Sequence, residues 1–201
     1  NMNSIRLSKG KTIYFTSDHH FGAPTKEASK PREKKFVKWL DHIKKDAQVL
    51  FILGDLFDFW FEYKYAAPKG FTRVIGKLAE LSDEGIDIHF FVGNHDMWMR
   101  GYLEQEVNMK IYYKPHEFNI NNKKFYIGHG DGLGPNDKGY KRLKKVFKNS
   151  FFNWLYRWLH PDLGIKFAQY LSLKNKLFSG SEDLKFIGKE QEWLTQYARK
   201  K

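Results

Sequence analysis

Residues 49–55 read VLFILGD, a continuous apolar run that ends in a glycine and an aspartate. Apolar runs of about four to six residues with such ends are typical of buried strands. The pattern therefore predicts a strand that delivers a carboxylate, Asp55, at its end. The same arrangement recurs along the chain, and its recurrence determines the fold class.

Three further runs share this arrangement. Residues 12–17 (TIYFTS), 88–92 (IHFFV) and 124–127 (KFYI) are followed by DHH, GNHD and GHGD. Helical patterns lie between the runs, because residues 31–47 and 71–84 each place their apolar side chains on one helical face. Strands that alternate with helices predict an α/β fold.

The composition limits the possible classes of protein. The chain has 201 residues, of which 41% are hydrophobic and 17% aromatic, which suits one folded domain and excludes a disordered chain. The absence of cysteine excludes disulfides and thiolate metal sites. No apolar run approaches the ~18 residues of a membrane span, so we expect a cytoplasmic location.

The net charge of +12 is unevenly placed. Residues 138–161 contain seven basic residues and no acidic one. Such a patch favours an anionic partner: a nucleic acid, an anionic membrane surface or a phosphorylated substrate. The simpler explanation is an ordinary solvated helix face.

Each predicted strand is followed by side chains that can bind metal ions: Asp18 with His20, Asp55, Asn94 with His95, and His129. In α/β sheets, sites gather beyond the carboxyl ends of the strands, so these clusters should converge. A carboxylate shared by two cations and flanked by imidazoles and an amide oxygen would form a two-metal site for phosphoryl transfer. Oxygen and nitrogen ligands without sulfur suit manganese, iron or zinc and disfavour calcium.

Each cluster alone has a simpler interpretation. A Gly-Asp pair after a strand is usually a turn, Gly-Asn-His can be a turn or a cap, and His129 could lie in a flexible loop. The occurrence of all the clusters, each after a strand, favours the metal site.

The two histidines of the DHH stretch have different expected roles. An Asp-x-His spacing puts Asp18 and His20 on the same side of an extended segment, so we expect His20 to be the ligand. His19 should point the other way and pack or make a surface hydrogen bond. A separate manganese phosphoesterase family is named for the triplet Asp-His-His, but it also needs a glycine-rich motif ending in histidine, which this sequence lacks.

These motifs resemble the signature of the calcineurin-like metallophosphoesterases. The matching segments are Asp18-His19-His20, Gly54-Asp55-Leu56-Phe57-Asp58, Gly93-Asn94-His95-Asp96 and His129. The resemblance implies a double β-sandwich flanked by helices, with two divalent metal ions on one edge, and we expect manganese with iron or zinc as alternatives. It implies that Asp18 and His20 hold one metal, that Asn94 and His129 hold the other, and that Asp55 bridges them.

The resemblance also implies catalytic roles. His95 would face the scissile phosphate as an acid or a charge-stabilising group, and Asp96 would orient and charge it. Asp58 would support the ligands without binding metal itself.

One branch of the superfamily is closer. Residues 54–63 (GDLFDFWFEY) and 129–140 (HGDGLGPNDKGY) are similar to the UDP-2,3-diacylglucosamine diphosphatases of lipid A biosynthesis in Gram-negative bacteria. This resemblance implies hydrolysis of UDP-2,3-diacylglucosamine to UMP and 2,3-diacylglucosamine 1-phosphate, with Asn94, Asp137 and Tyr140 at the substrate. Many members have arginine where this chain has His95, so we expect its phosphate contacts to differ.

We expect residues 138–180 to form a helical cap insertion between a core of residues 1–137 and a return to the core at 181–201. Residues 151–159 (FFNWLYRWL) are apolar around most of a helix, and residues 138–148 are basic. A cap with apolar surface and cations suits a substrate with acyl chains and a diphosphate, although the aromatic residues could simply pack the cap onto the core. Candidates for phosphate or sugar contacts are Lys174 and Lys176.

Three hypotheses about function remain. The first is the lipid-linked UDP-sugar diphosphatase, peripheral at the inner face of the inner membrane. The second is a metallophosphoesterase acting on nucleic acid or nucleotides, and the third is a non-catalytic binding protein. The presence of the expected metal ligands and of His95 argues against a non-catalytic binding protein. The aromatic insertion favours the diphosphatase over the enzyme acting on nucleic acid, so we expect no nucleic-acid partner.

The superfamily pattern also has a late Gly-His-x-His, with one histidine for each metal. After His129 this sequence contains only His160. We therefore expect a C-terminally truncated chain in which the final core strands are missing.

Overall fold

The computed structural model describes most of the first two thirds of the chain and part of the remainder: residues 3–96, 98–130, 149–158, 160, 162–164, 166 and 170. The chain divides into two compact units, Asn1–His129 and Gly130–Lys201. Each unit is described below by itself. The expected domain boundaries at residues 137/138 and 180/181 lie outside the described residues.

The first unit contains two sheets. One has four parallel strands in the order β2 (Thr12–Thr16), β3 (Ala47–Ile52), β4 (Asp87–Phe91) and β5 (Lys110–Tyr112). The other has the order β1-β6-β7, in which β1 is parallel to β6 and β6 is antiparallel to β7; these strands are β1 (Asn3–Ile5), β6 (His116–Ile120) and β7 (Lys123–Ile127).

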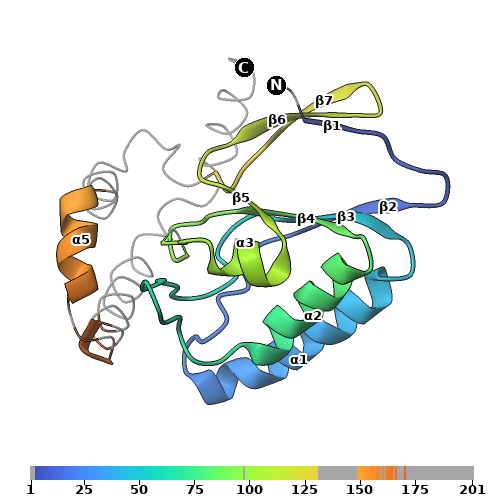
Figure 1. The fold of residues 1–201 in the computed structure, drawn as a ribbon. Coiled ribbons are helices and arrows are strands. Elements are labelled where there is room, and N and C mark those ends of the chain that lie inside the picture. The colour runs from blue at the N-terminus through green and yellow to red at the C-terminus, as the bar shows by residue number, and fades with distance from the viewer. Residues whose placement is uncertain are drawn as a thin grey trace, which may run out of the picture. The chain divides into compact units, whose positions relative to one another are not determined.

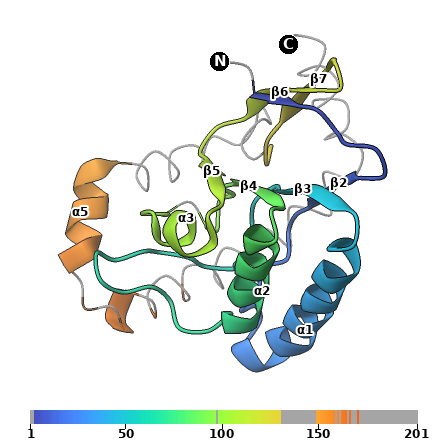
Figure 2. The ribbon, with the colours of Figure 1, turned by 45° about the vertical axis from the view of Figure 1, so that its right-hand side comes forward.

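Three helices cover the outer face of the four-stranded sheet: α1 (Lys26–Ile43), α2 (Thr72–Asp83) and α3 (Tyr102–Val107). Figure 1 shows them on the side away from β1, β6 and β7, and Figure 2 shows the same layers after a turn of the molecule. The first unit is therefore a helical layer on a two-sheet sandwich, and the expected α/β sandwich is confirmed.

The core lies between the two sheets. It is a cluster of buried side chains from both: Val49, Phe51, Phe91, Phe118, Ile120 and Ile127. Phe51 meets Phe118 edge to face, with ring centroids 5.1 Å apart. Because side chains alternate along a strand, Leu50 and Ile52 point to the opposite face, where the helices cover them, and both are fully buried. Burial on both faces explains why β3 is apolar without interruption from Val49 to Ile52.

The helices largely follow their predicted ranges. The helix expected at 71–84 is α2, and Gly85 follows it in a left-handed conformation. The helix expected at 31–47 begins earlier, at Lys26, because the Thr25 side chain accepts a hydrogen bond from the Ala28 amide at 3.2 Å and caps the first turn. Pro31 lies in the second turn of α1, so the prediction of its start was wrong by five residues. The predicted end was also wrong, because α1 ends at Ile43 and Ala47 is the first residue of β3.

In the second unit, the helix expected within residues 151–159 is α5 (Ser150–Trp158). Four apolar side chains three, four and seven positions apart are exposed along one side of it: Phe151, Trp154, Leu155 and Trp158. Consecutive aromatic rings along this row lie about 6 Å apart, at 6.1 Å for Phe151 and Trp154 and 5.9 Å for Trp154 and Trp158. Among the described helices, none is long and apolar enough to span a membrane.

A polar group interrupts the face of β4 that turns toward the second sheet. The His89 ring is buried, stacks on Phe51, and lies 3.1 Å from a carboxylate oxygen of Asp87 through Nε2. Lys110 on β5 lies 2.7 Å from the same oxygen. The hydrogen bond from His89 and, next, the one from Lys110 together lower the pKa of Asp87 to about 2 against the opposing effect of burial.

We predict that Asp87→Asn destabilises the protein at neutral pH by about 1 kcal/mol, the scale of a partly exposed ion pair. The pKa of Asp87 is below the ordinary 3.8, so its contribution is full above pH ~4 and is lost as the pH falls through about 2. Urea unfolding of both proteins between pH 7 and pH 2 measures this. The difference between them should disappear at the acid end, and a difference that stays constant with pH would contradict the assignment.

Candidate metal centre

The polar side chains that follow the strands meet at one edge of the four-stranded sheet. The loop after β2 runs against the loop after β3, because the Asp18 and His20 amides donate to the Gly54 and Asp55 carbonyls at 3.1 and 2.9 Å. The loop after β4 joins them through the His95 amide, which donates to Asp55 Oδ1 at 3.0 Å. The predicted convergence of the clusters is therefore found.

Asp55 lies at the centre of this edge. Its Oδ2 atom is 3.5 Å from His129 Nε2 and 3.7 Å from His20 Nε2. The metal-competent atoms of Asp18, Asp55 and His129 all lie within 4.8 Å of one another. His129 Nε2 is also 3.3 Å from the Asn94 amide oxygen. Asp55 Oδ2 thus lies near two imidazoles, as the oxygen of a carboxylate shared by two cations would.

The orientation of His129 suits metal binding. Its Nδ1 atom lies 2.6 Å from the Leu53 carbonyl oxygen, which can only accept a hydrogen bond. Nδ1 therefore carries a proton, and Nε2, which faces Asp55 and Asn94, is the atom that a cation would bind in place of a proton. Metal-ligating histidines usually have this arrangement. A divalent cation thus fits the donor set of carboxylate, imidazole and amide oxygen at this edge.

Two glycines allow the ligands to approach this closely. A Cβ atom on Gly93 would lie 2.0 Å from Asp55 Oδ1, and one on Gly54 would lie 2.6 Å from His129 Nδ1. Gly54 also has a φ of +89°, which side chains disfavour. Both glycines are therefore required by the space at the site, and Gly54 is required by its backbone conformation as well.

The DHH segment has a different backbone from the one expected. Asp18 and His20 have φ values of 57° and 46°, so the segment is left-handed at both residues and not extended. His20 nevertheless faces Asp55. His19 packs away from the site as expected: its ring stacks on Phe21 at 5.1 Å, and burial lowers its pKa to about 4.

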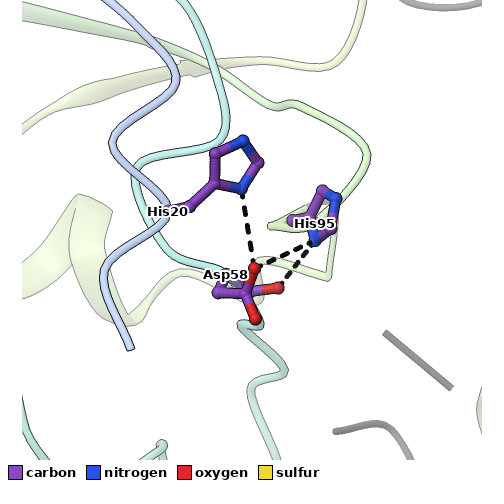
Figure 3. A group of neighbouring side chains, drawn as sticks. All are labelled: His20, Asp58 and His95. Carbon is purple, nitrogen blue, oxygen red and sulfur yellow. Dashed lines mark hydrogen bonds and ion pairs between the residues drawn. The ribbon is translucent and has the colours of Figure 1, made fainter. Parts of the chain in front are cut away.

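Asp58 lies between two imidazoles, as Figure 3 shows. Its Oδ1 atom is 3.7 Å from His20 Nδ1 and 3.8 Å from His95 Nδ1, and its backbone carbonyl lies 2.8 Å from His95 Nδ1. These three residues form a second group whose ligand atoms lie within 4.8 Å of one another. The Asp58 carbonyl accepts the hydrogen bond of His95 Nδ1, so Asp58 orients the His95 ring.

Asp96 makes different contacts from those expected. We expected its carboxylate to orient His95, but it is fully buried and accepts hydrogen bonds from the backbone amides of Gly93 and Leu56, both at 2.8 Å. Asp58 has the position beside His95 instead. Asp96 follows His95 directly in sequence, but its side chain turns inward and joins the loops after β3 and β4.

The pKa values of the two buried carboxylates of the site are shifted in opposite directions. Burial raises the pKa of Asp96 to about 7, and the negative charge of Asp55 adds to that effect. Burial also acts to raise the pKa of Asp55, but the hydrogen bond and charge of His129 and the charge of His95 outweigh it, so the pKa is lowered. Asp55 is therefore an anion at neutral pH, as a ligand shared by two cations must be.

The remaining expected site residues lie outside the described residues: Asp137, Tyr140, Lys174 and Lys176. The contact between Asp58 and His95 was missed by sequence reasoning. The one available signal was that Asp58 follows Asp55 by three residues in the same loop.

Comparisons with known proteins show the family of the chain. The family model described as calcineurin-like phosphoesterase matches residues 11–195. A UDP-2,3-diacylglucosamine hydrolase of Porphyromonas gingivalis is 36% identical over 93% of this chain and 76% of its own length. A protein of the same name from Histophilus somni is 26% identical over 92% of this chain and 77% of its own length. A solved structure of a protein of unknown function from Aquifex aeolicus is 19% identical, covers 73% of each chain and has a TM-score of 0.44, too low to support a conclusion.

We predict that substitutions at Asp55 and His95 have separable effects. Asp55→Ala should lower bound metal at both positions and abolish phosphoester hydrolysis, because it removes the shared carboxylate. His95→Ala should leave metal content near normal while turnover falls by ~10²-fold or more, the scale of a lost acid or charge-stabilising group.

Elemental analysis of the purified variants and a phosphodiesterase assay measure both effects. Two bound metals and retained activity in Asp55→Ala would rule out the shared carboxylate. Loss of metal from His95→Ala would instead make His95 a ligand.

Proposed function

Because the chain belongs to the calcineurin-like phosphoesterase family, we propose that it hydrolyses UDP-2,3-diacylglucosamine to UMP and 2,3-diacylglucosamine 1-phosphate. The observation that carries the reaction class is the carboxylate of Asp55 between His20 and His129. The substrate follows from the relative of that name, which is 36% identical over nearly the whole chain.

We assign two divalent cations to the site. Asp18 and His20 would hold one, Asn94 and His129 the other, and Asp55 would contact both. Bound there, the cations supply Lewis acidity that activates water and stabilises the attacking and leaving oxygens. We propose manganese, with iron or zinc as the alternatives, because the ligands combine carboxylates, imidazoles and an amide oxygen without sulfur.

The chain's own residues contribute orientation and proton transfer. In the hydrolysis, a water oxygen forms a bond to one phosphorus of the diphosphate, and the bond between that phosphorus and the bridging oxygen breaks. The bridging oxygen leaves on the other phosphate and takes up a proton. His95 would supply this proton, because its Nδ1 atom is held 2.8 Å from the Asp58 carbonyl oxygen, which leaves Nε2 for the substrate.

We propose that residues 138–180 form a cap that binds the acylated sugar, between a core of residues 1–137 and a return to the core at 181–201. The exposed apolar row of α5 supports this proposal, because burial of each acyl methylene is worth about 0.8 kcal/mol. Asn94, Asp137 and Tyr140 would line the substrate cleft. Lys174 and Lys176 would contact phosphate or sugar.

An assay with matched substrates tests the function. With Mn²⁺ present, we expect the protein to release UMP from UDP-2,3-diacylglucosamine, and to act at least ~10²-fold less efficiently on UDP-N-acetylglucosamine, which lacks the acyl chains. The Asp55→Ala variant is the control for a contaminating hydrolase. Faster cleavage of DNA or cyclic nucleotides than of the acylated substrate would favour the nuclease alternative, and no hydrolysis of any substrate would favour a binding protein.

We propose that the protein works in the cytoplasm, peripheral at the inner face of the inner membrane. Its substrate carries two acyl chains and therefore resides at a lipid surface. The aromatic row of α5 and the basic residues at 138–148 suit an anionic membrane surface, because aromatic rings enter the headgroup region and cations attract anionic lipids.

Vesicle sedimentation tests this location. We expect binding to phosphatidylglycerol vesicles, weaker binding to neutral vesicles, and a loss of ~5-fold or more in Trp154→Ser/Trp158→Ser, since each indole contributes apolar area. The matched control is Phe125→Ser, which removes an exposed aromatic residue of β7. Equal binding by the two variants would contradict the role of α5.

A further inference from the structure

The segment that carries Asp18 and His20 has little regular structure to hold it. It leaves β2 after Thr16, contains two left-handed residues, and reaches α1 at Lys26. Left-handed conformations at residues other than glycine cost free energy, so they persist only where surrounding contacts impose them. The contacts that impose this conformation therefore decide whether His20 and Asp18 are in place before a cation arrives.

Helix α1 supplies such contacts through Arg32. The guanidinium donates from Nη1 to the His19 carbonyl at 2.9 Å and from Nη2 to the His20 carbonyl at 3.4 Å. Nη2 also donates to the Ala23 carbonyl. One rigid, charged group thus holds three carbonyls of a single loop, and charge-assisted bonds of this kind are stronger than neutral ones.

A second contact from α1 strengthens the same attachment. The Ser29 hydroxyl accepts a hydrogen bond from the Gly22 amide at 2.8 Å and donates to Glu33 at 2.9 Å. Ser29 and Glu33 are both buried. The first half of α1 therefore binds the loop through two side chains. The Arg32 guanidinium donates to carbonyls of the loop, and the Ser29 hydroxyl accepts from its Gly22 amide.

We propose that Arg32 is a positioning residue for the metal centre, and that it holds the loop of residues 18–23 in the conformation that lets Asp18 and His20 bind a cation. The inference rests on the proposed metal site. The two possible roles of Arg32 predict opposite changes in metal affinity. Arg32 is a cation near the site, so charge alone would make its removal strengthen metal binding. A positioning role predicts that its removal weakens metal binding.

The test is a titration of metal-free protein with Mn²⁺, followed by calorimetry. Arg32→Gln should lower the affinity for the cation held by Asp18 and His20 by about 10- to 100-fold, the usual effect of losing a group that orients a ligand. Arg32→Lys keeps the positive charge but not the planar guanidinium, so it should recover only part of the metal affinity that Arg32→Gln loses. Lys35→Gln removes a charge from an exposed position of the same helix, and should leave affinity unchanged or slightly higher.

The melting temperature of each metal-free variant separates positioning from general damage. For Arg32→Gln it should match that of Lys35→Gln. Mn²⁺ affinity within twofold of the unsubstituted protein, or a lower melting temperature that accounts for the loss, would overturn the inference while leaving the proposed function intact. An unsubstituted protein that binds no Mn²⁺, Fe²⁺ or Zn²⁺ would overturn the metal site and this inference together.

Discussion

The carboxylate of Asp55 is the group on which the rest of the site depends. It is buried, yet it stays ionised because His129 and His95 lie beside it and the His95 amide donates to it. Every neighbouring motif has a feature that accommodates this anion: the glycines that leave room for it, the imidazoles that face it, and the loops that bend around it. An isolated buried carboxylate would be costly, so this arrangement is understandable only as a place for positive charge.

The parts of the fold that could be predicted from sequence are those whose local pattern matches their final environment. β3 is apolar from Val49 to Ile52 because both of its faces are buried there, and α2 has a clear apolar stripe and a glycine at its end. β5 and α3 were not predicted. β5 has only three residues and depends on pairing with β4, and α3 has only six, so neither carries enough pattern to be seen alone.

The site shows the same division. The residues that end strands were predictable, because strand ends meet at one edge whatever the loops do. The arrangement of Asp58 and Asp96 was not, since it depends on how each loop turns after its strand. Adjacency in sequence placed Asp96 beside His95 in the prediction, whereas the folded backbone directs Asp96 inward and brings Asp58 to the imidazole. Arg32 gave no signal, because it is one of many basic residues in α1.

His129 follows β7, whereas Asp18, Asp55 and Asn94 follow strands of the other sheet. A cation held by these residues would therefore join the two halves of the sandwich, as a cross-link does. Cation binding and folding are then linked. The free energy of cation binding adds to the stability that the aromatic rings packed between the sheets give to the folded state. Loosening the interior at Phe118 or Phe51 would weaken cation retention without touching a ligand, and depletion of the cation would loosen the interior in return.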